Sequence, residues 1–484
     1  MVNRKLLEII GLWGKEAQKE FQIFLASPYF NKGVQATVLL QFYNLVLKYG
    51  ANPEHPKLGK EAVVKHLFGG ARAEKKEFSR LDKLGSGLLA LAEQYLAQKE
   101  YESRQSDARK LLALMKFYRI HHKDHRAWQA KEAAFKALEA APWRDAWHYF
   151  DAFELHGEVA NMGLPYSTLK KDLGLDLADQ ALDKFFVAAK LEIEVTKLMQ
   201  SHLSNAKHQP TRLTDAARNW IPAPGEEIPA LIELQNDLIK MFERLPGAAE
   251  AIAFENKITV FRHLFPYELT RYLYTCCRGV ITLLWGQFQD DLNIRQAAFQ
   301  LFKRHLEEGY LLFDGKINTN SLRTLLAFSL SADETAWAKK LLEDFPPESL
   351  FGTKHSTEFC QLNWAYYYFF LKDYDNAEKH LRFSSFENQL FGLMAEIQLI
   401  KIYYETGNEL LEARMKALDQ KIRRTSHTEA WKLQFSNFLK MLEKLLRAHQ
   451  TNENAARLGL LNELSTSTAV YSKEWLLEKL SVKL

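Results

Sequence analysis

Residues 359–413 carry one pattern twice, and this recurrence constrains the fold more than any other feature of the sequence. In the first copy a large apolar residue, a small residue and a tyrosine precede a second small residue and a leucine: Trp364, Ala365, Tyr368, Ala377 and Leu381. The corresponding residues of the second copy are Leu399, Ile400, Tyr403 and Ala413. Recurrence after roughly 34 residues is typical of helical hairpins that stack, because one hairpin alone cannot bury its apolar face. Stacked hairpins usually serve as binding surfaces.

The composition allows helix through most of the chain. Only 22 glycines and 13 prolines occur in 484 residues, and the abundant Leu, Ala, Lys and Glu are good helix formers. A chain of this length exceeds one ordinary core, so we expect several domains or one elongated repeat array. The sequence therefore predicts an all-α fold of antiparallel helical hairpins, without a sheet of three or more strands.

Helix breakers divide the chain into four expected regions. Residues 1–102 are predicted to form a helical N-terminal region, and residues 103–201 long amphipathic helices paired as hairpins. The stretch 202–229 is rich in breakers, namely Pro210, Pro222, Pro224, Gly225 and Pro229. We interpret it as a long connection and a domain boundary, anchored by Trp220. Residues 230–484 are predicted to hold stacked hairpins, at 320–345, 357–384 and 390–423, followed by C-terminal capping helices.

Charge and cysteine usage indicate the compartment. The formal net charge is +4, from 64 basic and 60 acidic residues, which gives no global argument for nucleic acid or an anionic membrane. The three cysteines are Cys276, Cys277 and Cys360, and two adjacent cysteines with one left over do not suggest a disulfide framework. The sequence shows no convincing secretory signal and no apolar run long enough for a membrane helix. We therefore expect a cytoplasmic protein.

The first copy of the pattern resembles a tetratricopeptide repeat, a hairpin of two helices. Ala365 and Ala377 take the family's two small-residue positions, and Tyr368 takes its aromatic position. Lys372 stands where that family usually has Gly, and Ile400 replaces the small residue in the second copy. The resemblance implies an α-solenoid of stacked hairpins. The helical N-terminus is also similar to uncharacterised bacterial helical-repeat proteins, which implies no particular activity.

The resemblance also implies a binding surface, because the first helices of tetratricopeptide repeats line a concave face. The residues at those positions here are Phe359, Leu362, Tyr366, Phe369, Phe370, Met394, Ile397, Lys401, Tyr404 and Glu405. An apolar and aromatic groove of this kind suits a helix or an extended apolar peptide. The alternative is that these side chains only pack against the neighbouring hairpin. Five of them are our candidate contacts to a protein partner: Tyr366, Phe369, Lys401, Tyr404 and Glu405.

A second candidate surface lies between residues 414 and 447, which hold nine basic and three acidic residues. Such a local excess can contact nucleic acid, and helical repeats can bind RNA or DNA in this way. The candidate contacts are Arg414, Lys421, Arg423, Arg424 and Lys432. The alternative is a solvated face of the capping helices.

The sequence holds only weak candidates for a catalytic or metal site. His121 and His125 have the spacing of one helical turn, which can hold a metal. No Glu occupies the general-base position between them, however, and Lys123 and Arg126 add positive charge beside them, so a solvated helix end is the alternative. Asp145 and His148 could form an oriented base, but no nucleophile can be assigned to them. We therefore expect no catalytic, cofactor or metal site. The sequence predicts a non-enzymatic protein-interaction scaffold, with a nucleic-acid-binding or regulatory protein as the alternative.

Overall fold

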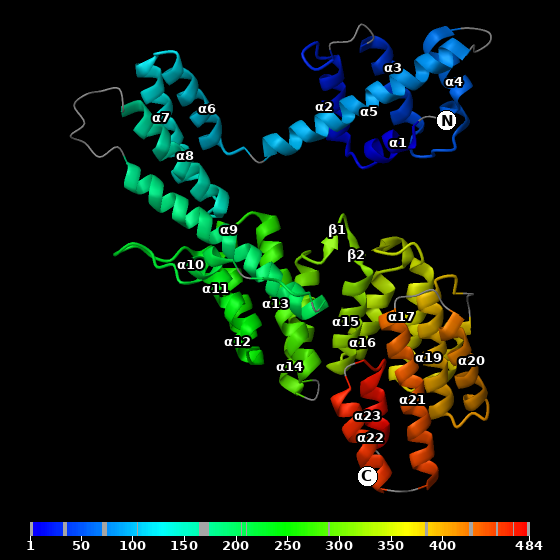
Figure 1. The fold of residues 1–484 in the computed structure, drawn as a ribbon. Helices are drawn as coiled ribbons and strands as arrows, with labels where there is room; N and C mark the ends of the chain where they lie inside the picture. The colour runs from blue at the N-terminus through cyan, green and yellow to red at the C-terminus, as the bar shows by residue number, and fades with distance from the viewer. Residues whose placement is uncertain are drawn as a thin grey trace. The chain divides into compact units, whose positions relative to one another are not determined.

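The computed structural model describes twelve stretches of the chain: residues 3–31, 36–69, 75–103, 105–163, 174–204, 206–209, 211–288, 291–382, 386–424, 429–451, 454–467 and 469–481. These stretches hold 23 α-helices (Figure 1). The prediction of an all-α fold is therefore confirmed. None of the helices in these stretches is long and apolar enough to cross a membrane.

The chain forms two compact units. The first contains Met1–Ala141 and Phe150–Asp179, and the second contains Pro142–Tyr149 and Gln180–Leu484. The units thus divide near residues 141–150 and 179–180. The predicted division into four regions, with a boundary at 202–229, stays a prediction.

In the first unit, the N-terminal helices surround one aromatic core. They are α1 (Arg4–Gly11), α2 (Lys15–Ala26), α3 (Ala36–Tyr49), α4 (Lys60–Val64) and α5 (Lys75–Ser103). Phe21 of α2 is buried and meets Tyr43 of α3 and Tyr95 of α5 at ring distances of 5.1 and 5.3 Å. Helix α2 ends where Ser27 becomes extended, at ψ 120°, because the residue before a proline disfavours the helical region.

Two ion pairs fasten a second helix group within this unit. The group consists of α6 (Asp107–Ile120), α7 (Asp124–Ala140) and α8 (Ala146–Gly163). The carboxylate of Asp151, which is buried on α8, accepts from Arg109 Nε at 2.8 Å and from Ser106 Oγ at 2.6 Å. Two turns further along α8, Glu158 pairs with Arg119 of α6. Both pairs have a buried carboxylate, so breaking either would leave an uncompensated charge.

The second unit contains most of α9 (Leu175–Ser204), from Gln180 onward, and then a helix that the sequence did not indicate. Helix α10 (Arg212–Arg218) lies inside the stretch 202–229, which we had interpreted as a connection. Trp220 packs against the buried core directly after this helix, as expected of an anchor. Pro210 lies outside the described residues.

Six helical hairpins and a final helix follow. The hairpins are α11 (Ala230–Glu243) with α12 (Ala248–Phe261), α13 (Tyr267–Gln287) with α14 (Leu292–Glu307), α15 (Thr319–Ser331) with α16 (Thr335–Asp344), α17 (Ser356–Phe370) with α18 (Tyr374–Arg382), α19 (Gln389–Glu405) with α20 (Leu411–Arg424), and α21 (Glu429–Thr451) with α22 (Asn454–Thr466). The chain's last described helix is α23 (Lys473–Ser481). The two helices of every pair are in contact, and α17 also contacts α15 and α19.

Three of these hairpins turn in the same way. The first helix ends with a residue in the left-handed region, namely Asp333, Lys372 and Gly407, at φ 64°, 60° and 65°. The next backbone N–H then donates to the carbonyl five residues earlier, at 2.8 to 3.0 Å in each case. This bond satisfies a carbonyl at the helix end and reverses the chain. Lys372 therefore adopts a conformation that glycine takes without a steric penalty.

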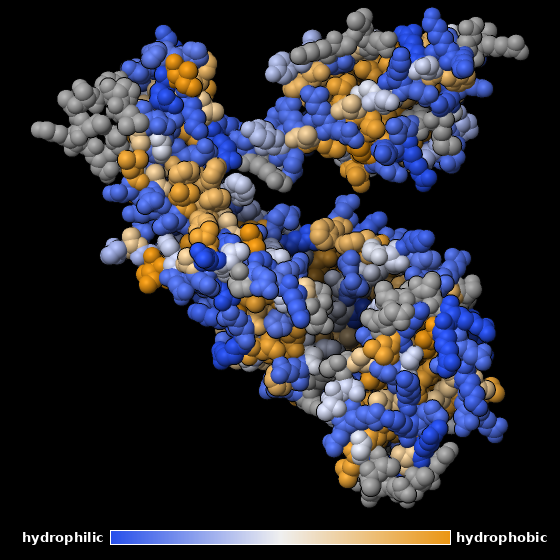
Figure 2. Space-filling model, in the orientation of Figure 1, coloured by the Kyte–Doolittle hydropathy of each residue, from blue (hydrophilic) through white to orange (hydrophobic). Residues whose placement is uncertain are grey.

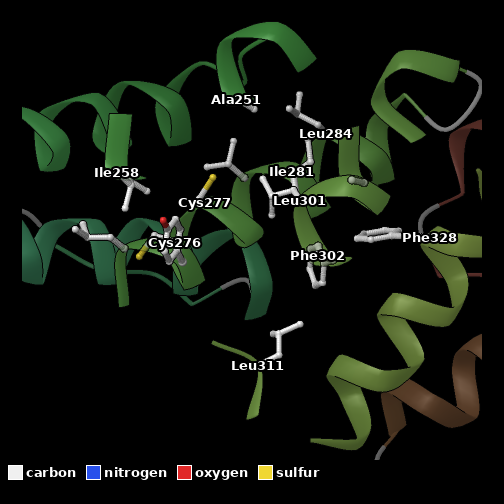
Figure 3. Packing of buried hydrophobic residues seen from close by; sticks show 14 of the residues in the cluster. Ala251, Ile258, Cys276, Cys277, Ile281, Leu284, Leu301, Phe302, Leu311 and Phe328 are labelled. Atoms are coloured by element: carbon white, nitrogen blue, oxygen red, sulfur yellow. The ribbon is translucent and has the colours of Figure 1, made fainter. Parts of the chain in front are cut away.

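The core of the second unit includes the cysteine pair. Figure 3 shows Cys276 and Cys277 of α13 among side chains of α12 and α14, such as Ile258 and Leu301. Both thiols are free and buried, as is that of Cys360. Burial raises the pKa of Cys276 to about 12, so this thiol stays protonated and unreactive at neutral pH.

The expectation that no sheet of three or more strands exists was wrong. Strands β1 (Leu312–Phe313) and β2 (Lys316–Asn318) pair antiparallel, and β3 (Leu350–Phe351) adds to β2 in parallel. The β1–β2 turn is Asp314-Gly315, and both residues have positive φ. That dipeptide is a standard signal of a tight hairpin turn. The strands are so short that no alternating pattern marks them in the sequence.

The small residues of the first repeat copy lie where expected, but those of the second copy do not. Ala365 of α17 and Ala377 of α18 are fully buried between helices in contact. Ala413 of α20 is exposed. The match between Ala413 and Ala377 is therefore wrong, and Leu418 is the buried residue nearby on α20.

Enlarging either buried alanine should destabilise the protein. We expect Ala365→Leu and Ala377→Leu each to lower the free energy of unfolding by about 1–3 kcal/mol, because the extra methylenes overpack a close helix contact. Ala413→Leu is the matched control on an exposed helix position. Urea denaturation of the three variants checks this, and equal stability of all three would show that the helices of this hairpin do not need small residues.

Candidate partner-binding face

The five predicted partner contacts lie on α17 and α19, which are the first helices of two neighbouring hairpins. Helix α17 carries Tyr366 and Phe369, and α19 carries Lys401, Tyr404 and Glu405. The ammonium of Lys401 lies 4.5 Å from the centre of the Phe369 ring, so the two helices are joined at this point. We call these five residues the partner face.

The chain's own last helix lies on much of the partner face. Trp475 of α23 meets the Tyr404 ring at 5.1 Å, edge to face, and its indole Nε1 donates to Glu405 Oε1 at 2.7 Å. Lys479, one turn further along α23, places its ammonium 2.7 Å from the same oxygen. Figure 1 draws this C-terminal helix in red, with α17–α20 in the same compact unit.

The expected open groove is therefore absent at Lys401. This residue is only 4% exposed, and Phe369, Tyr404 and Glu405 are half-buried. The residue spacing identified a common face but could not show that a distant segment covers it. The predicted role of these side chains in partner binding stays a prediction, with the added condition that α23 must share or leave the face.

Lys401 is an unusual buried cation. Within the described part of the chain its ammonium lies against aromatic rings, Phe369 on one side and Trp475 at 5.5 Å, and not in an ion pair. Cation–π contacts of this kind contribute about 0.5–2 kcal/mol. Burial lowers the pKa of Lys401 to about 8, although the charges of Glu474 and Glu405 oppose this shift. Removal of the ammonium from water thus outweighs its attraction to the carboxylates.

Tyr366 marks the part of the partner face that remains open. Its side chain is 36% exposed, yet burial still raises the pKa of its hydroxyl, with the charge of Arg323 opposing and Tyr471 and Glu474 adding to the shift. Nearby, Arg323 of α15 donates to the Tyr471 hydroxyl at 3.4 Å.

The basic segment 414–447 is largely compensated by acidic side chains. Arg414 and Lys421 approach Glu396 of α19 at 3.3 and 3.7 Å. Lys444 pairs with Glu463 of α22 at 2.6 Å. Both carboxylates lie outside the segment, so counting charges within it overstated the local excess. The face drawn in Figure 2 shows hydrophilic side chains over α20 with apolar ones between them.

The remaining nucleic-acid candidates are dispersed. Arg423 pairs with Asp419 at 2.7 Å, Arg424 is exposed at the end of α20, and Lys432 is half-buried on α21. Arg424 and Lys421 share a small hollow between α19 and α20. Nucleic-acid binding by this segment stays a prediction.

The histidine and aspartate constellations have structural explanations. His121 and His125 are exposed and belong to different sides of a turn, because α6 ends at Ile120 and α7 begins at Asp124. Their spacing is therefore not that of one continuous helix. Asp145 accepts from the backbone N–H of His148 at 2.9 Å, at the start of α8. Burial lowers the pKa of His148 to about 4, so the ring is neutral at physiological pH.

Sequence reasoning missed one possible metal-ligand cluster. His355, Glu358 and Glu387 bring ligand atoms within 4.8 Å of one another. The two oxygens of Glu358, however, accept from the backbone N–H groups of Glu387 and Asn388, both at 3.1 Å, and Oε1 also lies 3.0 Å from His355 Nδ1. These bonds fix the start of α19, which explains the buried carboxylate without an ion.

A buried polar network was also missed, because its members lie far apart in sequence. Glu255 of α12 pairs with Arg304 at 2.7 Å and lies 3.2 Å from His305 Nε2, both on α14. Arg278 of α13 donates to His305 Nδ1 at 3.0 Å. Because an arginine can only donate, Nδ1 must accept and the proton lies on Nε2, toward Glu255. The network ties three helices of two hairpins together.

Comparison with family models, with curated protein sequences and with solved structures finds no match to this chain. The resemblance to tetratricopeptide repeats therefore rests on the residues named above and stays a prediction.

Replacing Lys401 should stabilise the protein in a pH-dependent way. The folded pKa of about 8 lies below the unfolded value of 10.5. Below pH 8 the amine is charged in both states and burial destabilises the fold; from pH 8 to 10.5 the folded state has lost this proton and stability rises. We expect Lys401→Met to raise the free energy of unfolding at pH 7 by roughly 1–2 kcal/mol, and by less at pH 10.

Chemical denaturation at both pH values measures this difference. Lys440→Met is the matched control, because Lys440 is exposed on α21 and its replacement should change stability little at either pH. An equal gain for Lys401→Met at pH 7 and pH 10 would rule out a buried charge as its cause.

Proposed function

We propose that this protein is a non-enzymatic scaffold that binds a protein partner through the partner face of α17 and α19. The observation that carries the proposal is the ring of Tyr366, which stays 36% exposed while the other four members of the face are buried or half-buried. Interfaces draw most of their binding energy from a few such anchors, with Tyr and Arg enriched among them.

The surroundings of Tyr366 suit the side chains of a partner. Phe370, one helical turn further along α17, is 41% exposed, and Leu371 is 43% exposed, so the exposed apolar surface extends beyond Tyr366. Arg323 supplies a positive charge beside it. A partner with an apolar or aromatic side chain next to an acidic group would match both features.

The proposal includes the architecture and the compartment. The shared turn at Asp333, Lys372 and Gly407 supports successive hairpins of one design, which we propose to be a tetratricopeptide-like α-solenoid. The three free, buried cysteines support a reducing compartment, and we propose the cytoplasm. Nucleic-acid binding by residues 414–447 has weaker support, because carboxylates outside the segment neutralise part of its charge.

Removing the Tyr366 ring should abolish partner capture without unfolding the protein. We expect Tyr366→Ala to weaken binding by roughly 2 kcal/mol, or about 30-fold, because the ring is an exposed anchor. Full-length wild-type protein, Tyr366→Ala and the control Tyr101→Ala are immobilised and compared by quantitative mass spectrometry of captured proteins. Tyr101 is 67% exposed on α5, so its replacement matches the loss of an exposed ring.

Proteins retained by the wild type and by Tyr101→Ala but lost from Tyr366→Ala support the proposal. If all three immobilised proteins capture the same set of proteins, any partner binds at a surface other than Tyr366. Capture that depends instead on added nucleic acid and falls steeply with salt would favour the basic segment.

A further inference from the structure

The contact between α23 and the partner face has the features of a bound ligand. Two side chains of α23, Trp475 and Lys479, reach one oxygen of Glu405, each at 2.7 Å. They lie one helical turn apart, so a single helix presents both to the same carboxylate. An indole N–H and an ammonium are both donors, so both can bond to the half-buried carboxylate oxygen.

The ring of Trp475 completes an enclosure for Lys401. Trp475 is 6% exposed, and its ring lies 5.5 Å from the Lys401 ammonium, which is also 4.5 Å from the Phe369 ring. Tyr404 borders the same indole ring edge to face. Three members of the partner face thus recognise one tryptophan, each by a different interaction.

The helix that supplies this tryptophan is short. Helix α23 has nine residues, which is too few for a stable helix by itself. It starts after Ser472, whose φ of 49° is unfavourable for a residue with a side chain. Its buried leucines, Leu476 and Leu480, belong to the core that includes α21. Its position therefore depends on packing against α21 and the partner face, which another amphipathic helix with the same apolar residues could also provide.

We propose that the partner face is a receptor for an amphipathic helix with a tryptophan and a lysine one turn apart, and that α23 occupies it until a protein partner supplies such a helix. This inference rests on the proposed function and names the class of partner. The partner helix also needs apolar residues next to the tryptophan and the lysine, at the positions that Leu476 and Leu480 hold in α23. Displacement is a population shift in which the helix with the better contacts prevails.

The chemistry of Glu405 makes the receptor selective. A helix with phenylalanine in place of the tryptophan keeps the ring that faces Lys401 and Tyr404 but lacks the N–H donor. The half-buried carboxylate would then lose one of its two partners, and a buried acceptor without its donor is unfavourable. The receptor should therefore prefer tryptophan to phenylalanine beyond the difference in ring size.

A reciprocal substitution experiment tests this. The probe is a fluorescent synthetic peptide with the sequence of residues 471–481, titrated into the full-length protein. Phenylalanine in place of the tryptophan in the peptide should weaken binding by about tenfold, whereas Trp475→Phe in the protein should strengthen binding of the unaltered peptide by about tenfold, since it weakens only the competing helix. Trp128→Phe in the protein, at an exposed ring of α7, is the control and should change nothing.

Hydrogen exchange of ¹⁵N-labelled wild-type protein shows whether α23 leaves. With excess unlabelled peptide, amides of residues 473–481 in the protein should exchange faster, while those of α21 stay protected. Absence of peptide binding to the Trp475→Phe protein, or binding that leaves exchange of α23 unchanged, would overturn the proposal. A concentration-dependent dimer that exchanges α23 between copies would also overturn it, because the occupant is then a second copy of this chain.

The experiment separates this inference from the proposed function. The peptide tests the contacts that Trp475 makes with Lys401, Tyr404 and Glu405, whereas capture tests the exposed ring of Tyr366. If the peptide binds as expected but Tyr366→Ala captures the same proteins as the wild type, the helix receptor is supported and the binding site at Tyr366 is refuted. If capture depends on Tyr366 but the peptide does not displace α23, the binding site at Tyr366 is supported and the helix receptor is refuted.

Discussion

The hairpin turn is the constraint on which the second half of this structure depends. After the first helix of a hairpin, one residue in the left-handed region allows the next N–H to bond five residues back, and the second helix then runs back along the first. Asp333, Lys372 and Gly407 fulfil this role in consecutive hairpins, and His122 does so between α6 and α7 at φ 53°. The first helices of these consecutive hairpins are also in contact in sequence order, α15 with α17 and α17 with α19.

The hairpins show which part of the fold could be predicted from the sequence. Helix periodicity and breaker positions are local, so the three predicted hairpins agree with α15–α20 to within a few residues. The turn itself was harder to recognise, because Lys372 stands in a conformation that favours glycine and is held there by the bond from Asp373 to Tyr368. Local rules also failed for the sheet: Asp314-Gly315 indicates a tight turn, but β3 comes from residues 350–351, and its pairing is a tertiary contact.

On the partner face, too, a contact between neighbouring hairpins could be predicted from the sequence, whereas a contact with a distant segment could not. The spacing of α17 and α19 placed Phe369 and Lys401 side by side, which the structure shows directly. It gave no sign of Trp475, which lies 70 residues from Glu405 in the chain. A lysine in a helical pattern is ordinarily assigned to solvent, since burying an unpaired ammonium is unfavourable. Only the placement of α23 reveals that two aromatic rings take the place of water around Lys401.

The partner face carries two opposite charges that do not pair with each other while α23 is in place. Glu405 is satisfied by Trp475 and Lys479, and Lys401 by aromatic rings. Yet Lys401 and Glu405 are four residues apart on α19, a spacing at which helix side chains can form an ion pair. We infer that, once α23 leaves, these two side chains regain water and come within reach of each other. Departure of the helix therefore need not leave a buried charge without a partner, which is the usual obstacle to opening a polar contact. A face on which both charges have contacts when covered and reach water when open is suited to exchange one helix for another.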